Sequence, residues 1–193
     1  MNQPVETVKY KNHVIEIHYD DSPMNPMQDF DYLGTFVCWH RTYNLGHKHN
    51  FNSSQDFKQF REENEIAICL PLYAYIHSGI TISTGTFHCP WDSGQIGYVY
   101  LTKEKFLKEY GEMTDENLAK AESAMKAEVN EYDDFLTGQV YRYIIKDEDD
   151  EEYESVNGFF GYDSIKNMIE ECKSLIDNRI ETIAKGFPEA ILI

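Results

Sequence analysis

The chain has 193 residues, of which 41% are hydrophobic and 14% aromatic, a composition that is typical of a folded protein and excludes a disordered one. Its formal net charge of −17, from 34 Asp and Glu against 17 Lys and Arg, opposes direct binding to nucleic acid and to acidic membranes. No apolar run reaches transmembrane length, the first residues lack the pattern of a secretion signal, and the four cysteines form no CxxC pair. We therefore expect a cytoplasmic protein with reduced thiols and no membrane contact.

The first half of the chain alternates β-prone runs with polar loops. Residues 20–31 and 40–53 are rich in residues that favour loops, and Ser54 or Asp56 can cap a short helix that ends near Glu63. Strands are expected over residues 13–19, 32–39, 66–76, 80–83 and 96–102.

The second half mixes helices with a hairpin. Helices are expected over about 102–111 and 114–136, the longer one because its apolar residues recur every three to four positions. Strands over 138–146 and 153–160 flank six consecutive acidic residues, which predicts a hairpin with an acidic turn. A clean apolar stripe predicts a final amphipathic helix over about 163–185.

This order of elements predicts an α+β fold. We expect a mainly antiparallel sheet with helices packed on one face and the amphipathic C-terminal helix among them. The length fits a single domain over residues 1–193, with a soft boundary near 111–114 where a glycine separates the two expected helices.

Residues 77–95 hold the densest group of chemically capable side chains. The weak catalytic candidates are His77, His88, Cys89 and Asp92. A nucleophilic Ser78 would need a base other than the adjacent His77, because neighbours on a strand point to opposite faces, and no G-x-S-x-G elbow is present. Cys89 would need a positive neighbour to form a thiolate. A turn at Ser78 and a packed, structural Cys89 are therefore the favoured interpretations.

Metal binding is a further hypothesis for the histidine-rich loop. His40, His47 and His49 lie close in sequence, but zinc needs three or four ligands, so the fold would have to bring in others from the 77–95 region. The acidic run 147–152 lacks the glycine that a calcium loop requires. We predict no metal site and no cofactor.

Two interpretations stay open for the segment 90–97, Pro-Trp-Asp-Ser-Gly-Gln-Ile-Gly. Its proline and glycines are typical of a tight loop in which Trp91 is a hydrophobic anchor. The same segment can be a recognition loop with Trp91, Asp92 and Gln95 as contacts.

The negative charge is uneven along the chain. Residues 109–154 hold sixteen Asp or Glu against four Lys or Arg. A surface of this sign attracts basic surfaces, including those that bind nucleic acid, although an acidic surface also serves solubility. The residues predicted to bind a partner are Asp133, Asp134, Asp147, Glu148, Asp149, Asp150, Glu151 and Glu152, together with Trp91 and Gln95 from the loop.

Several segments resemble one family. They are 70–81 (LPLYAYIHSGIT), 89–97 (CPWDSGQIG) and 132–141 (YDDFLTGQVY), with a further similarity at 41–47 (RTYNLGH), where family members often carry aspartate at the position of His47. The family comprises small, uncharacterised proteins encoded by bacteriophages and mobile elements, and the resemblance spans roughly residues 33–162. It implies a soluble accessory protein that acts inside a bacterial cell, and it carries over no functional residue.

Charge and context together lead to one main hypothesis. The protein would inhibit or modulate a host nucleic-acid enzyme, in the manner of an anti-CRISPR or antirestriction protein, by acidic mimicry of nucleic acid. Its partner would be a basic surface of a host protein such as a nuclease, with Tyr132, Tyr141, Tyr143 and Tyr153 giving apolar contact. The alternatives are a hydrolase or metal-dependent enzyme that uses residues 77–95, and a structural or assembly protein of a phage particle. We expect a binding protein rather than an enzyme.

Overall fold

The computed structural model describes residues 3–185 and divides the chain into two compact units. Unit 1 combines residues 1–23 with residues 138–193, and unit 2 comprises residues 24–137. The division lies at 23/24 and 137/138 and not near 111–114, which is a turn within unit 2. This division results from strand pairing between distant parts of the chain. A local sequence pattern does not reveal such pairing.

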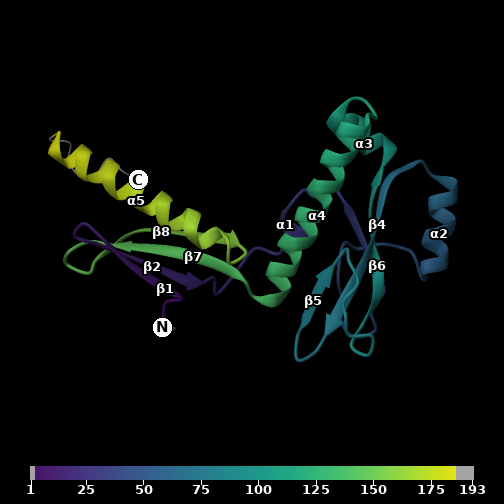
Figure 1. The fold of residues 1–193 in the computed structure, drawn as a ribbon, viewed down its shortest axis with the longest axis horizontal. Coiled ribbons are helices and arrows are strands. Elements are labelled where there is room, and N and C mark those ends of the chain that lie inside the picture. Colours follow the sequence, from purple (N-terminus) through teal and green to yellow (C-terminus); the bar gives the residue numbers. More distant parts are fainter. Residues whose placement is uncertain (1–2, 186–193) are drawn as a thin grey trace. The chain divides into compact units, whose positions relative to one another are not determined.

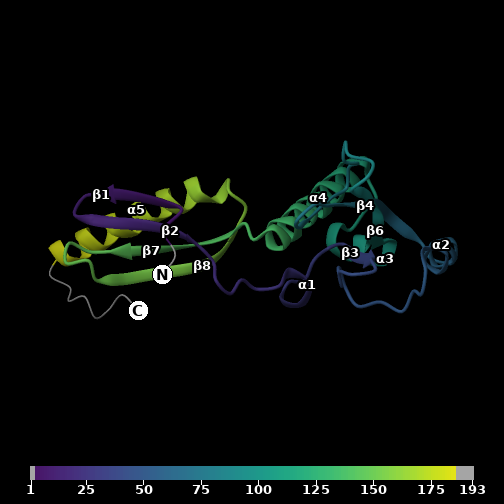
Figure 2. The ribbon, with the colours of Figure 1, turned by 90° about the horizontal axis from the view of Figure 1, so that it is seen from below.

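Unit 1 is a four-stranded antiparallel sheet with one helix. The strands are β1 (Glu6–Tyr10), β2 (His13–Tyr19), β7 (Val140–Lys146) and β8 (Glu152–Phe160), in the order β1-β2-β7-β8, followed by helix α5 (Ser164–Ala184). The pairing of β2 with β7 joins the N-terminal hairpin to the C-terminal part of the chain. Helix α5 runs along one face of this sheet (Figures 1 and 2).

The core of unit 1 follows from the periodicity of its elements. Side chains alternate across a strand, so Ile15 and Ile17 of β2 and Tyr143 and Ile145 of β7 face the helix and are buried. The apolar stripe of α5 covers them and contributes Ile165, Met168, Ile169, Cys172 and Ile176 to the same cluster. This packing confirms the amphipathic C-terminal helix.

Unit 2 contains the second four-stranded antiparallel sheet. Its elements are α1 (Pro26–Asp29), β3 (Thr35–Cys38), α2 (Ser54–Glu63), β4 (Ile66–Ile76), β5 (Ile80–Ser83), β6 (Ser93–Thr102), α3 (Lys103–Tyr110) and α4 (Asp115–Thr137), with the strand order β3-β6-β4-β5. Strand β3 approaches β6 closely at Gly97, where an added Cβ would lie 2.0 Å from the carbonyl oxygen of Val37. Only glycine fits this position.

The two faces of the unit 2 sheet pack against different helices. Val99 and Leu101 of β6 share a buried cluster with Met125 of α4, whereas the alternate residues Tyr98 and Tyr100 contact the Phe57 ring of α2. Figure 1 shows α2 and α4 on opposite sides of β4 and β6.

The α+β class with antiparallel pairing is confirmed, and the structure adds to it. Residues 3–185 form two sheets and not one, and the unit 2 sheet has helices on both faces. Strand β1 and the four-residue α1 were not predicted, because β1 is a short edge strand with a charged pattern and α1 lies among prolines. Asp163 does not cap α5 with its side chain; the Ser164 hydroxyl instead donates to the Gly161 carbonyl oxygen.

Candidate functional site

Three of the four candidate catalytic residues, His77, Cys89 and Asp92, lie close together in unit 2. The Asp92 carboxylate lies 3.8 Å from Nδ1 of His77 and 3.6 Å from the Sγ atom of Cys89. His88 is exposed and makes no hydrogen bond or ion pair within residues 3–185. The pairing of β4 with β6 causes this convergence, because it places Ser93 opposite Tyr75, two residues before His77.

The order of these three groups does not suit nucleophilic catalysis. A cysteine nucleophile is activated by a histidine that an acid in turn orients, so the histidine stands in the middle. Here Asp92 stands in the middle and contacts both the thiol and the imidazole, so the histidine does not lie between the acid and the nucleophile. The Asp92 carbonyl also accepts a hydrogen bond from the Ile76 N–H, and the Ser93 hydroxyl donates to the Cys89 carbonyl. These contacts fix the shape of the loop.

The histidine-rich loop is held by contacts with the backbone of β3 and with its own backbone. Nδ1 of His47 accepts from the Phe36 N–H at 3.0 Å, and Nδ1 of His40 accepts from the Thr42 and Tyr43 N–H groups. No group of three or more His, Cys, Asp or Glu side chains suited to a metal ion occurs in the part of the chain that the structure describes. The geometry therefore gives no support to a zinc site.

The acidic residues of α4 are largely bound within unit 2. The Asp133 carboxylate accepts from the Thr81 hydroxyl at 2.8 Å and from the Ile82 N–H at 2.7 Å. Glu128, which the sequence did not single out, accepts from the N–H groups of Leu33 and Gly34. Burial raises the pKa of both carboxyl groups above the ordinary value, and the hydrogen bonds from the backbone oppose this rise.

These hydrogen bonds give Asp133 a structural role. Its carboxylate pairs with the edge strand β5 and is half-buried. The neighbouring Asp134 is also half-buried. The acidic segment 109–154 is divided between the two units: residues 109–137 belong to unit 2 and residues 138–154 to unit 1.

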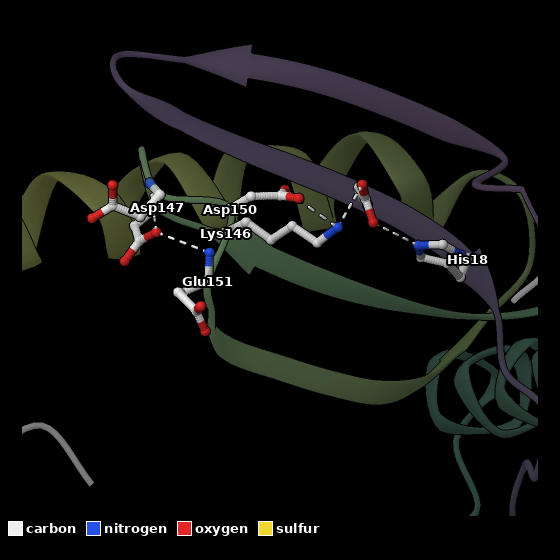
Figure 3. Close-up of polar contacts among 7 residues, drawn as sticks. His18, Lys146, Asp147, Asp150 and Glu151 are labelled. Atoms are coloured by element: carbon white, nitrogen blue, oxygen red, sulfur yellow. Dashed lines mark hydrogen bonds and ion pairs between the residues drawn. The ribbon is translucent and has the colours of Figure 1, made fainter.

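The turn between β7 and β8, residues 147–152, is the acidic tip of unit 1. Asp147 turns inward: its carboxylate accepts from the N–H groups of Asp149 and Glu151, both at 3.0 Å. Figure 3 shows the bond from Glu151 to Asp147 beside the β7 strand. Five consecutive acidic residues of the tip are exposed, namely Glu148, Asp149, Asp150, Glu151 and Glu152.

A row of ion pairs and hydrogen bonds connects this tip to β2. Lys146 lies 3.7 Å from the Asp150 carboxylate and 3.0 Å from that of Glu16, which in turn lies 3.0 Å from Nε2 of His18 (Figure 3). The hydrogen bond with Glu16 raises the pKa of Lys146. Although partial burial opposes it, the bonds from His18 and Lys146 lower the pKa of Glu16.

Beside the tip lies a groove of about 550 Å³, the α5 groove. Ile180 and Ile183 of α5 contribute apolar surface to it and are 37% and 44% exposed, although both belong to the predicted apolar stripe. The remaining lining residues are Lys11, Asn12, His13, Asp147, Glu148, Asp149 and Arg179. Exposed carboxylates next to exposed aliphatic side chains can bind a surface that is both basic and apolar.

Gln95 and Trp91, the two remaining predicted contacts, differ from each other. The Gln95 amide donates to the Gly97 carbonyl within its own strand at 3.2 Å, whereas the Trp91 side chain is 91% exposed. No described helix is long and apolar enough to cross a membrane. Comparison of the chain with family models, curated proteins and solved structures finds no match.

Proposed function

We propose that this protein is an accessory protein of a bacteriophage or mobile element that binds a basic surface of a host nucleic-acid enzyme and inhibits or modulates it. The five exposed residues of the acidic tip, Glu148–Glu152, would replace the phosphates of nucleic acid at that surface. The proposal extends the resemblance of the sequence to phage-encoded proteins, and it places the contact in unit 1.

One observation carries this proposal: five consecutive exposed carboxylates stand on a turn whose backbone is bonded to Asp147. Like charges repel each other, so a flexible acidic run would spread out in solution. Hydrogen bonds to the Asp147 carboxylate oppose this and keep the charges close together. A dense, ordered charge accelerates association with a basic partner and makes the affinity depend on salt.

The test is displacement of DNA from an enzyme with a basic channel. A fluorescent DNA duplex is bound to an RNA-guided nuclease or a restriction endonuclease, and its release is followed by anisotropy as the protein is added. The variant Glu148→Gln/Asp149→Asn/Glu151→Gln/Glu152→Gln retains Asp147 and Asp150, which hold the turn. We expect it to need at least about 10-fold more protein for the same release, and we expect added salt to reduce this difference.

A control variant that removes the same number of negative charges distinguishes an effect of the acidic tip from an effect of the net charge. Glu104→Gln/Glu109→Gln/Glu112→Gln/Asp115→Asn neutralises four exposed acidic residues of unit 2. We expect it to displace DNA almost as well as the natural protein. Equal losses in both variants would mean that net charge alone acts, and an unchanged tip variant would contradict the proposal.

A further inference from the structure

The two tryptophans of the chain have opposite surroundings. Trp39 packs against the His49 and Phe57 rings, and its Nε1–H donates to the Phe51 carbonyl oxygen at 3.1 Å. Trp91 is 91% exposed, the most of any large hydrophobic residue described, and its side chain makes no ring contact or hydrogen bond within residues 3–185. An exposed indole next to a fixed loop is typical of a residue that becomes buried on association.

The backbone on both sides of Trp91 is held in place. On one side the Cys89 carbonyl accepts from the Ser93 hydroxyl, and on the other the Asp92 carbonyl accepts from the Ile76 N–H at 2.8 Å. The Tyr75 ring lies 5.9 Å from that of Phe87 and supports the same loop. Because the loop is ordered before any contact forms, burying Trp91 costs little conformational entropy.

A pocket lies beside this loop in the same unit. It measures about 350 Å³ and is formed around the β4–β5 turn and the end of α4; we call it the hairpin pocket. Tyr75, Ile80 and Leu136 contribute apolar lining, and the polar lining includes His77. Since His77 contacts Asp92, the residue after Trp91, the loop that carries the exposed indole adjoins the hairpin pocket.

The strands and loop of this surface carry little charge, and the nearby α4 carboxylate of Asp133 is half-buried and bonded to Thr81 and Ile82. Residues 66–102 contain no Lys or Arg and only one acidic residue, Asp92, in a chain whose net charge is −17. The absence of cations disfavours phosphates, whether of nucleic acid or of an anionic membrane. It also reduces the repulsion that two copies of an acidic protein would meet at this surface.

We propose that the surface binds a second copy of this chain, with Trp91 of each copy entering the hairpin pocket of the other. A projecting side chain and a pocket that lie side by side on one surface can pair reciprocally about a two-fold axis, which gives a closed dimer and not a filament. Each dimer then buries two indoles.

The dimer is weak and becomes stronger as salt rises. Two indoles and two pockets bury less area than a standard protein interface, so we expect a dissociation constant in the micromolar range. Added salt screens the repulsion between two copies that each carry a charge of −17. Binding through the acidic tip is weakened by salt, so the two contacts respond in opposite directions.

Sedimentation equilibrium over about 1 μM to 1 mM protein tests the proposal directly. Trp91→Ala should weaken the dimer at least about 30-fold, the effect of a strong interface residue. Gly79→Phe places a ring at the pocket, where an added Cβ meets no atom within 4 Å, and should weaken it similarly. Met113→Ala, which removes another exposed apolar residue of unit 2, serves as the control and should change nothing.

Mixing the two variants gives the sharpest result. Trp91→Ala retains an open pocket and Gly79→Phe retains the indole, so their mixture can form one intact indole–pocket contact. We expect the mixture to associate more strongly than either variant alone and more weakly than the natural protein. Three results would overturn the proposal: a natural protein that stays monomeric at 1 mM, a mixture no stronger than its parts, or a monomer that binds neutral phosphatidylcholine vesicles through Trp91.

Discussion

Unit 1 and unit 2 are each built on a four-stranded antiparallel sheet with a long helix on one face, yet their carboxylates lie in different surroundings. In unit 2, Glu128 and Asp133 of α4 accept hydrogen bonds from backbone N–H groups of neighbouring segments. In unit 1, five carboxylates of the acidic tip are exposed, and the turn is held by Asp147 and by the pairing of Asp150 with Lys146. Acidic residues of one stretch of sequence therefore stabilise the structure in unit 2 and are exposed on the surface in unit 1.

Removing the Glu128 carboxylate should have the largest effect on stability. Glu128→Ala leaves the Leu33 and Gly34 N–H groups without their acceptor, and each half-buried unpaired donor costs about 1–2 kcal/mol, so unit 2 should lose about 2–4 kcal/mol. Both tryptophans belong to unit 2, so tryptophan fluorescence during urea unfolding reports on this unit alone. The matched change Glu122→Ala breaks only an exposed pair with Lys126 and should cost about 0.3–0.5 kcal/mol. Similar losses of unfolding free energy in Glu128→Ala and Glu122→Ala would show that the Glu128 carboxylate does not stabilise unit 2 more than an exposed one does.

Asp133→Ala should cost about 1–3 kcal/mol, because the Thr81 hydroxyl and the Ile82 N–H lose one shared acceptor. The loss is local to the edge strand β5, so hydrogen exchange at the Ile82 amide should accelerate more than exchange in β6. Asp133→Asn retains one acceptor oxygen and should cost less. Unchanged exchange at Ile82 would show that Asp133 does not hold the edge.

Asp147→Ala should cost about 1 kcal/mol, since the bonds that it removes are exposed to water. The amides of Asp149 and Glu151 should then exchange faster, whereas Glu148→Ala, which removes a carboxylate bonded to Asn12 and not to these amides, should leave them unchanged. A tip that keeps its slow exchange without Asp147 would show that its order has another source.

Acidification should affect Glu16 of unit 1 and the Glu128 and Asp133 carboxyl groups of unit 2 with opposite signs, by no more than about 1 kcal/mol for each group because these groups are partly solvated. Glu16 in unit 1 has a lowered pKa in the folded state, so its contribution is present above its ordinary value of 4.5 and is lost as the pH falls through the folded pKa. Glu128 and Asp133 have raised pKa values, so their ionisation disfavours the folded state at neutral pH, and this penalty disappears as the pH falls. Amide exchange measured in both units between pH 7 and pH 3.5 should therefore show unit 1 losing more protection than unit 2. A greater loss of protection in unit 2 than in unit 1 would contradict these pKa directions.

The smallest effect is expected at the loop candidates of unit 2. His77→Ala should change stability by no more than about 0.5 kcal/mol, because His77 meets Asp92 at an exposed site. Urea unfolding followed by fluorescence measures this change. A loss of several kcal/mol, or a hydrolytic activity that disappears in this variant, would revive the enzyme hypothesis.

Much of the local structure was predictable from sequence, because helices and strands depend on the periodicity of their apolar residues. The long strand 66–76 and the helices at 54–63 and 115–137 follow their patterns closely. The division into units was not predictable, since it depends on β2 pairing with β7 across more than a hundred residues. The meeting of His77, Cys89 and Asp92 likewise required the pairing of β4 with β6.

The acidic tip shows what the sequence by itself determined: six adjacent carboxylates cannot be buried without partners, because the loss of hydration is too costly, so their place at a solvated turn followed from their order alone. Only the tertiary structure decided the roles of Glu128, Asp133 and Trp91. A carboxylate on a helix has the same local pattern whether it faces water or an unpaired backbone N–H, and a tryptophan in a tight loop has the same pattern whether it packs inward or points outward. Residues from distant parts of the chain determine these surroundings. They donate hydrogen bonds to the Glu128 and Asp133 carboxylates, and they leave the Trp91 indole exposed.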